Sequence, residues 1–397
     1  MKQRTEKIKR GAIKVTRVET FVVDASWRDY LFVKVTTDNG LVGWGEGTSG
    51  KEFVVAEAVR TLADRFVIGM NPFNIEGLCA KFFQVERSLM FSALAAVEMA
   101  LWDVVGKACG EPVVNLVGGK VRDRVRAYAN GWAFGLLDDL PALQKQAHKV
   151  VALGFRAMKF DPFTRGLPCG GRELGKQELR KATKRVAAVR KAVGTDVDLM
   201  IECNGRFTVG MALETIKALQ EFDPVFFEEP IPSLNAASMA WVTAAASALG
   251  ARVATGEHLG SCYGFQELLS RNAAHVVQPD IGRNGGFLET KKVAAMADAC
   301  YVSVAPHNCN GPGQHVAHIH LCANIPNFLI LESWVPFEHL PWRKDLTRGE
   351  PAFVDGDYVV PDSPGWGVEF NESEIRRRVS SPGRPRTGKF GSLIQSR

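Results

Sequence analysis

The sequence predicts an α/β protein, in which a (β/α)8-type barrel follows an α+β section at the N-terminus. Three observations support this fold class. The chain has 397 residues, of which 46% are hydrophobic and 23% charged, an ordinary globular composition. That length exceeds the ~250–300 residues at which a single core stops growing, so a barrel with an appended part is expected. From about residue 124 onward, apolar strand-like runs alternate regularly with helical stretches.

The N-terminal section has the pattern of a small antiparallel sheet followed by helices. Its expected strands are 15–23, 30–37 and 43–46, and its expected helices are 53–66 and 88–105. The Asp-Asn-Gly turn at 38–40 separates the second strand from the third. Gly106 and Gly110 are stop signals for the second helix. We predict an α+β capping domain over residues 11–123.

The barrel is predicted over residues 124–340. Its expected strands are 125–132, 156–161, 198–203, 225–229, 252–257, 275–280, 302–307 and 328–332, and its clearest helices are 140–153, 178–193, 209–222, 286–299 and 311–323. Strands that alternate with helices pair in parallel through right-handed crossovers. Eight such strands in ~210 residues close most economically into a barrel. A doubly wound open sheet is the alternative, but no GxGxxG motif follows the first strand.

Both ends of the chain are basic. The net charge is +6, but residues 1–10 carry +4 and residues 376–397 carry +7, which leaves −5 for the body between them. We therefore predict two solvated, disordered tails and no nucleic-acid partner. Between the barrel and the second tail, residues 341–375 are expected to return to the capping domain and complete it.

The sequence also predicts a compartment. It has no run of ~18 apolar residues that could span a membrane, and its N-terminus has no secretory signal. Its eight cysteines include no CxxC pair. We predict a cytoplasmic protein with reduced thiols and no membrane partner.

Polar and titratable residues follow the predicted strands, at the end of a barrel where functional side chains lie. In chain order they are Lys159, Asp161, Glu202, Asn204, Glu228, Glu257, Asp280, His307 and Glu332. Glu202, Glu228 and Glu257 end three successive strands, and an oxygen-only set of this kind suits Mg²⁺. Adjacent strand residues face opposite ways, so only one of Glu228 and Glu229 is expected to be a ligand.

The same residues carry a family resemblance. The motifs are Lys159-x-Asp161, Glu202-x-Asn204, Glu228-Glu229-Pro230, Gly256-Glu257, Pro279-Asp280, Pro306-His307 and Glu332, with Gly43-Trp44-Gly45-Glu46, Ala100-Leu101-Trp102-Asp103 and Pro364-Gly365-Trp366-Gly367-Val368 outside the barrel. This set resembles the enolase superfamily, in particular the mandelate racemase/muconate lactonizing enzyme group and its gluconate- and galactonate-type acid-sugar dehydratases. The resemblance implies a modified (β/α)7β TIM barrel with a cap, one Mg²⁺ per subunit, a small-molecule sugar acid as substrate, and a homo-oligomer.

The resemblance also implies residue roles. His307 is the expected base for the α-proton, and Asp280, one strand earlier, would accept from its second ring nitrogen and set its tautomer. Lys159 would face the substrate carboxylate, and Glu332 would support the enediolate or a hydroxyl. The three glutamates 202, 228 and 257 would hold the Mg²⁺.

Two departures from the family pattern favour dehydration. Asp161 stands where racemases of the family carry a second lysine, and Asn204 stands where galactonate-type dehydratases often carry a histidine. Both stay among the candidate catalytic residues. Racemisation needs bases on both faces of the α-carbon, whereas a syn β-elimination can use one histidine first as base and then as acid.

We therefore expect a Mg²⁺-dependent hydro-lyase that converts an aldonate or aldarate through an enediolate to a 2-keto-3-deoxy sugar acid. The second enzymatic hypothesis is a racemase, epimerase or cycloisomerase that acts on a related acid. A non-catalytic carboxylate-binding relative is the alternative from another class.

Substrate contacts are expected from His258, from Arg206, and from Trp27 of the capping domain, with Arg28 and Tyr30 near it. The glycine-rich stretch at 164–171 is expected to form a mobile lid over the mouth. Three further histidines look like a metal cluster but are expected to pack on the helix after the seventh strand, because ligands belong at strand ends. They are His315, His318 and His320.

Overall fold

The computed structural model describes residues 13–26, 28–85, 90–163, 172–337, 340 and 342–383. The N-terminal part is an antiparallel sheet of order β1-β2-β3 with helices packed on it. Its elements are β1 (Val15–Ala25), β2 (Arg28–Thr37), β3 (Val42–Glu46), α1 (Glu52–Leu62), a π-helical turn η1 (Ala63–Val67), α2 (Ile75–Val85), α3 (Phe91–Cys109) and α4 (Val113–Leu116). The three predicted strands are present, whereas α2 was not predicted.

Helix α3 lies unusually close to β3. A Cβ atom on Gly43 would lie 2.1 Å from the carbonyl oxygen of Ala100, and one on Gly45 would lie 2.0 Å from that of Ala96. Glycine is therefore required at both positions in β3, because any side chain would push the helix off the strand. This contact explains the Gly-Trp-Gly-Glu motif.

The helix also passes through one of its expected stop signals. Gly106 lies inside α3, and Gly110, with φ 71°, ends it. A Cβ atom on Gly106 would lie 2.5 Å from the Cα of Gly365, so this glycine serves a close approach of the C-terminal segment rather than a helix end.

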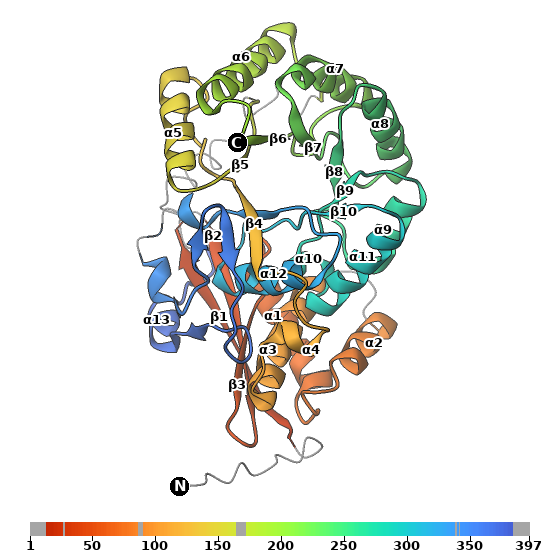
Figure 1. Cartoon of the computed structure of the whole chain (residues 1–397). Helices are drawn as coiled ribbons and strands as arrows, with labels where there is room; N and C mark the ends of the chain where they lie inside the picture. Colours follow the sequence, from red (N-terminus) through yellow and green to blue (C-terminus); the bar gives the residue numbers. More distant parts are fainter. Residues whose placement is uncertain are drawn as a thin grey trace.

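The second part is a parallel sheet whose strands alternate with helices (Figure 1). Its strands are β4 (Arg124–Ala129), β5 (Ala157–Phe160), β6 (Asp198–Glu202), β7 (Pro224–Glu228), β8 (Val253–Thr255), β9 (Val276–Val277), β10 (Ser303–Val304) and β11 (Leu331–Ser333). They pair in chain order from β4 to β10, and β11 pairs in parallel with β4. Phe328, just before β11, forms a single parallel bridge with Val304 of β10. All eight predicted strands are therefore found in the predicted order.

Helices follow these strands and lie around their outer side (Figure 1). They are α5 (Leu140–Ala152), α6 (Lys176–Val193), α7 (Val209–Leu219) with the 3₁₀ turn η3 (Gln220–Phe222), α8 (Ala236–Ala248), α9 (Ser261–Ser270), α10 (Ile281–Asn284), α11 (Phe287–Ala299) and α12 (Pro312–Asn324).

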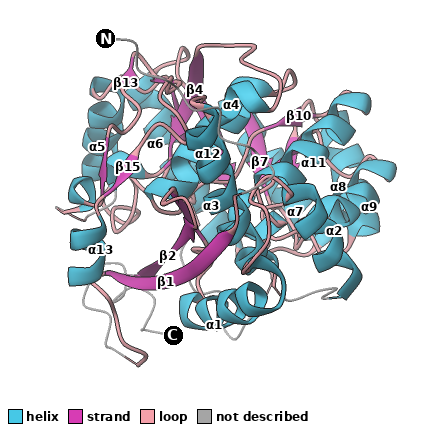
Figure 2. Cartoon of the chain, turned by 90° about the horizontal axis from the view of Figure 1, so that it is seen from below, coloured by secondary structure: helices cyan, strands magenta, loops and turns pink. Residues whose placement is uncertain are grey.

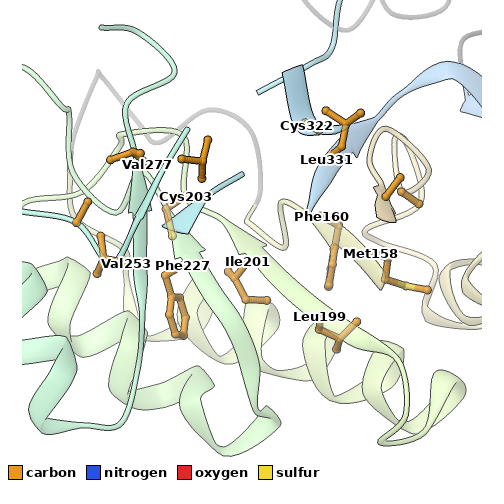
Figure 3. Packing of buried hydrophobic residues seen from close by; sticks show 14 of the residues in the cluster. Met158, Phe160, Leu199, Ile201, Cys203, Phe227, Val253, Val277, Cys322 and Leu331 are labelled. Carbon is orange, nitrogen blue, oxygen red and sulfur yellow. The ribbon is translucent and has the colours of Figure 1, made fainter. Parts of the chain in front are cut away.

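The parallel strands bury both of their faces. Leu199 and Ile201 of β6 belong to a large cluster that includes side chains of the surrounding helices (Figure 3). Met200, between them, faces the other way. It belongs to a separate buried cluster with one member from each strand or from the residue beside it: Tyr128, Ala157, Met200, Phe226, Ala254, Val276, Ala305 and Ile330. The eight strands thus share one apolar interior.

The C-terminal segment adds η4 (Val335–Phe337), η5 (Arg343–Asp345), β12 (Thr347–Arg348), β13 (Phe353–Val354), β14 (Asp357–Val359), β15 (Glu369–Phe370) and α13 (Glu372–Arg377). Part of it returns to the N-terminal sheet, where the Phe370 ring stacks on Trp44 with centroids 5.3 Å apart. The hairpin β13–β14 instead pairs with the first half of β4, through β14 in antiparallel register. The segment therefore contacts both parts of the protein.

Folded structure continues past the predicted boundary at residue 376. Helix α13 lies beside β1 (Figure 2), and Val379 forms an antiparallel bridge with Val23. Residues 1–10 and 384–397, which make up most of the two predicted tails, lie outside the described residues.

Among the described residues, no helix is long and apolar enough to cross a membrane. The seven cysteines in these ranges are all free thiols. The cytoplasmic location stays a prediction.

Candidate active site

The predicted strand-end residues lie at the carboxyl end of the parallel sheet. Lys159 is the third residue of β5, Glu202 and Glu228 are the last residues of β6 and β7, and Glu332 is the middle residue of β11. The other three, Glu257, Asp280 and His307, follow β8, β9 and β10 within three residues. All seven side chains are buried or nearly so.

Lys159 occupies the centre of one group. Its ammonium Nζ lies 2.9 Å from Glu202 Oε2 and 3.2 Å from Glu332 Oε1, and it contacts Glu228 Oε1. Burial alone would lower the pKa of Lys159, but the three carboxylates raise it well above its usual range. Burial and the nearby Glu202 raise the pKa of Glu228. One buried cation thus joins three strands.

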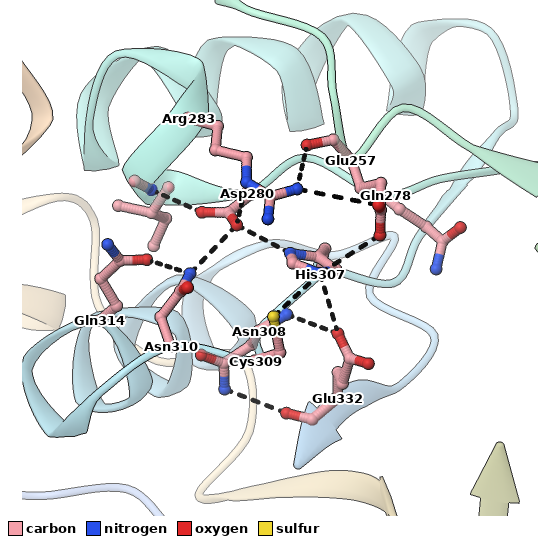
Figure 4. Close-up of polar contacts among 12 residues, drawn as sticks. Glu257, Gln278, Asp280, Arg283, His307, Asn308, Cys309, Asn310, Gln314 and Glu332 are labelled. Carbon is pink, nitrogen blue, oxygen red and sulfur yellow. Dashed lines mark hydrogen bonds and ion pairs between the residues drawn. The ribbon is translucent and has the colours of Figure 1, made fainter. Parts of the chain in front are cut away.

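His307 occupies the centre of the second group (Figure 4). Its Nδ1 lies 2.7 Å from Asp280 Oδ2, and its Nε2 lies 3.2 Å from Glu257 Oε2 and 3.9 Å from Glu332 Oε2. Burial alone would lower the pKa of His307, but Cys309, Glu257 and Glu332 raise it well above its usual range. The predicted pair of His307 and Asp280 is therefore formed, and Glu332 lies between the two groups.

Several polar residues of this group were not singled out from the sequence. Arg283, one turn after Asp280, lies 3.5 Å from Asp280 Oδ2 and 3.8 Å from Glu257 Oε1. Cys309 Sγ lies 3.3 Å from His307 Nε2, and Asn310 donates to Asp280 Oδ2 at 3.1 Å. Each stands within three residues of a predicted site residue, so its place just after a strand of the parallel sheet was the available signal.

The walls of the site hold further partners from strand ends. Asn130, directly after β4, donates from Nδ2 to Glu332 Oε1 at 2.5 Å. Gln278 donates to Glu228 Oε2 at 2.5 Å, and the backbone N–H of Asn308 donates to Glu332 Oε2 at 2.7 Å. These bonds hold the carboxylates in place.

Asp161 does not join either group. Its Oδ2 pairs with Arg206 at 2.5 Å and accepts from Asn204 Nδ2 at 3.2 Å. The backbone N–H of Asn204 donates to Glu202 Oε1 at 2.7 Å. Burial raises the pKa of Asp161 in spite of the opposing charge of Arg206. Asp161, Asn204 and Arg206 therefore form a neighbouring polar cluster beside Glu202.

His258, one of the expected substrate contacts, is mostly exposed, and its Nε2 lies 2.9 Å from Glu257 Oε1. Trp27 and the glycine-rich stretch 164–171 lie outside the described residues. Arg28 reaches from the N-terminal sheet to the site, where it donates to the carbonyl of Cys309 and, at 3.4 Å, to Asn310 Oδ1.

Glu228 and Glu229 point in different directions, as predicted. Glu229 accepts from Thr255 Oγ1 at 2.7 Å and from the N–H of Gly256 at 2.8 Å, away from Lys159. Burial, and then the charge of Glu257, raise the pKa of Glu229 to about 7.

The three histidines of α12 each have a separate partner. His318 accepts from the N–H of Ile281 at 3.3 Å, His320 accepts from that of Val114 at 3.2 Å, and His315 contacts Asn308 at 2.7 Å. They lie buried between the two parts of the protein and share no common centre.

The three predicted metal ligands can be tested against this arrangement. Within the described ranges, no three His, Cys, Asp or Glu side chains are grouped so that they could hold a metal ion. Glu202 and Glu228 face the Lys159 ammonium, whereas Glu257 faces His307 and His258. The donors themselves fit a hard divalent cation, because all are buried carboxylates at successive strands. Two of them contact the positively charged Lys159 ammonium.

Comparisons with known proteins agree with this fold. Residues 12–118 match the mandelate racemase/muconate lactonizing enzyme N-terminal domain, and residues 142–374 match the enolase C-terminal domain-like family. A D-gluconate dehydratase of Thermoproteus tenax is 37% identical over 90% of this chain and 72% of its own length. A D-gluconate/D-galactonate dehydratase of Picrophilus torridus is 34% identical over 88% of each chain.

Solved structures show the same architecture. The mandelate racemase/muconate lactonizing enzyme of Sulfitobacter sp. has a TM-score of 0.86 and 31% identity, over 94% of this chain and 97% of that one. The enzyme of the same name from Jannaschia sp. CCS1 has a TM-score of 0.85 and 32% identity, over 94% and 99%. The chain is thus a lyase that belongs to the mandelate racemase/muconate lactonizing enzyme family of the enolase superfamily, with acid-sugar dehydratases among its relatives.

Proposed function

We propose that this protein is a Mg²⁺-dependent dehydratase that removes water from an aldonate or aldarate and forms a 2-keto-3-deoxy sugar acid. One observation carries the choice of reaction. Among the described residues, the site has one histidine–aspartate pair, His307 with Asp280, while Asp161 is held in an ion pair with Arg206. A second free base, which racemisation would need, is not offered by Asp161. The names of the relatives support a sugar acid as substrate.

Mg²⁺ would be held by Glu202, Glu228 and Glu257. When bound, it would supply fixed positive charge to the substrate carboxylate as the α-proton is removed. Lys159, which contacts two of these glutamates, would face the same carboxylate.

His307 performs the proton transfers in this proposal. Because Nδ1 faces Asp280, Nε2 of the neutral ring is the atom that accepts the α-proton. Glu257, one of the carboxylates that raise the pKa of this ring, would hold Mg²⁺ instead. The protonated ring then donates the proton from Nε2 to the leaving hydroxyl at C3. Asp280 stabilises the imidazolium between these two steps, since it is buried and hydrogen-bonded to the opposite ring nitrogen.

The other predicted residues have supporting roles. Glu332 lies within reach of both Lys159 and His307, where it can position a hydroxyl of the substrate. Arg206, His258 and Trp27 are proposed to contact the polyol chain. Asn204 and Asp161 shape the wall next to Glu202. The protein is proposed to act as a homo-oligomer.

We also infer the domain boundaries and a closed barrel. The domains are a cap over 11–123, a barrel over 124–340 and a C-terminal segment over 341–375. Pairing of β11 with β4, the bridge between Val304 and Phe328, and the shared interior cluster support closure into a (β/α)7β barrel.

Turnover of sugar acids in deuterium oxide tests this function. The purified enzyme with Mg²⁺ is incubated with D-gluconate, D-galactonate, D-xylonate and a panel of aldarates. We expect a 2-keto acid from at least one of them, with deuterium at C3, and loss of turnover in His307→Ala. Exposed His148 on α5 provides the control His148→Ala, which should retain activity. Recovery of a C2-labelled epimer without keto acid would contradict dehydration and support a racemase or epimerase.

A further inference from the structure

A cavity of about 410 Å³ lies at the end of the parallel sheet opposite to the active site. Its lining consists of Arg122, Arg124, Arg126, Arg156, Phe328, Leu329, Asp355, Gly356 and Asp357. β4 begins at Arg124, β5 begins directly after Arg156, and β11 begins two residues after Leu329. The catalytic residues lie at the other ends of these strands, so the cavity is separate from the site.

The fold itself gathers the four arginines. Arg124 and Arg126 alternate on β4 with the buried Val125, so both lie on the same face of the strand as Tyr128, the face of the interior cluster. Arg156 directly precedes β5, which pairs with β4. The hairpin β13–β14 lies along the first half of β4 and brings residues 355–357 to the same opening.

Two of the arginines have no carboxylate partner in the part of the chain that the structure describes. Arg122 donates to the backbone carbonyl of Ile325 at 2.7 Å and to that of Pro326 at 3.2 Å, and its guanidinium lies 5.1 Å from the centroid of the Phe328 ring. These contacts fix its orientation and leave its charge uncompensated. Arg156 is exposed and makes no side-chain hydrogen bond or ion pair with another described residue.

The other two arginines are held by exposed ion pairs. Arg124 lies 3.3 Å from Asp357, and Arg126 lies 2.8 Å from Asp198, with all four side chains about a third to a half exposed. Exposed pairs of this kind contribute at most about 1 kcal/mol each, because water screens them. A ligand with higher negative charge can therefore compete for these guanidinium groups.

We propose that this cavity binds a small anion that carries phosphate groups. Guanidinium groups match phosphate oxygens in pairs of parallel hydrogen bonds and keep their charge at every physiological pH. The four arginines outnumber the two lining aspartates, and Phe328 with Leu329 supplies an apolar wall. The volume suits a metabolite such as a sugar phosphate or a nucleotide.

Calorimetric titration of the full-length protein tests the proposal. The protein is treated with EDTA, so that no metal complex forms, and titrated with pyrophosphate and separately with glucose 6-phosphate. We expect saturable binding that weakens as salt is raised. Arg156→Glu should weaken it at least about tenfold, and Arg156→Lys should weaken it less, because lysine keeps the charge but loses the paired hydrogen bonds. Arg60, an exposed arginine on α1, provides the control Arg60→Glu, which should bind as the wild type does.

Folding of Arg156→Glu is checked by its melting temperature, which should stay close to that of the wild type because the side chain has no described partner. Equal affinity of the wild type and Arg156→Glu for both probes would contradict the proposal. So would an absence of binding at millimolar concentrations of both. Catalytic turnover is not used as a readout, so this test is independent of the proposed dehydratase activity.

Discussion

At the scale of single residues, the buried Lys159 decides how the site is held together. Its ammonium is almost completely shielded from water and contacts Glu202, Glu228 and Glu332. A charge removed from water costs several kcal/mol unless opposite charges surround it. Three carboxylates on three strands meet this requirement for Lys159.

Replacement of Asp280 by Asn tests the histidine–aspartate pair. The amide cannot stabilise a charged His307 ring and can favour the wrong tautomer, so turnover should fall by about 10²-fold while KM changes little. Steady-state kinetics on the substrate found by screening measures both constants. The control is Asp357→Asn, which lies at the opposite end of the barrel. Unchanged turnover of Asp280→Asn would show that the pair has no part in the reaction.

The seven charged residues at strand ends could be predicted because all parallel strands end at one edge. Apart from the predicted pair of His307 with Asp280, the partners of these residues could not be predicted. Lys159 bonds to glutamates in this structure instead of facing open solvent, a consequence of burial that no sequence pattern displays. Arg283 lies on α10, after β9, and Asn310 lies in the loop after β10, so only the folded chain brings both to Asp280. The likeness to a family supplied the role of His307, which spacing alone leaves open.

At the scale of elements, α12 is the most deeply placed helix of the described chain. Every one of its residues is buried, because it lies between the parallel sheet and the N-terminal part. Burial lowers the pKa of its three histidines, so their rings are neutral. His320 accepts from the N–H of Val114 through Nδ1, so its Nε2 carries the proton and donates to the carbonyl of Trp366 at 3.1 Å.

Acid should destabilise the protein through His320. Burial lowers the pKa of this ring to about 4, whereas in the unfolded chain it is 6.5. The unfolded state therefore binds the proton first, and the contribution of His320 to stability is complete above pH 6.5 and lost as the pH falls toward 4. Between pH 7.5 and 5.5 this residue should account for a loss of about 1 kcal/mol.

Urea unfolding at the two pH values measures this loss. In His320→Gln the free energy of unfolding should be lower at pH 7.5, but it should decrease less on acidification than in the wild type. The exposed His148 serves as the control in His148→Gln, which should follow the wild type. An identical decrease in His320→Gln would assign the acid sensitivity to other groups.

Element prediction succeeded where periodicity is regular and failed where tertiary contact sets the limits. The eight alternating strands were found from their apolar runs. Gly106 was taken for a helix end, although the approach of Gly365 is what requires it. The hairpin β13–β14 pairs with β4, which lies more than 200 residues earlier, and no local pattern specifies such a partner. Helix α2 was missed beside the stronger signal of α3.

At the scale of the whole molecule, the N-terminal part is joined to the parallel sheet next to His307, the proposed base. Glu46, the last residue of β3, accepts from the backbone N–H groups of Gly311, Gly313 and Gln314 at 2.7, 2.8 and 3.1 Å. These groups form the start of α12, which attracts a negative charge. Arg28 adds a second contact to the same loop. Two residues of the N-terminal part, Glu46 and Arg28, therefore hold the loop after β10.

Replacement of Glu46 by Gln tests whether this contact positions His307. Gln carries no charge and turns N–H donors toward N–H donors, so stability should fall by roughly 2–3 kcal/mol. Backbone amides of 308–314 should exchange faster with deuterium, and turnover should drop. The matched control is Glu52→Gln. Glu52 is an equally buried glutamate of the same part, but it accepts from Ser49 and Gly50 within its own loop.

The control should lose stability without a selective increase of exchange at 308–314. If both variants expose these amides equally, Glu46 contributes only to general stability. If exchange at 308–314 rises in Glu46→Gln alone but turnover is unchanged, the contact holds the loop without positioning His307. The expected result, faster exchange together with lower turnover in Glu46→Gln alone, would show that the N-terminal part places the base through one buried carboxylate, because the loop from His307 to α12 has no other anionic anchor from β3 among the described contacts.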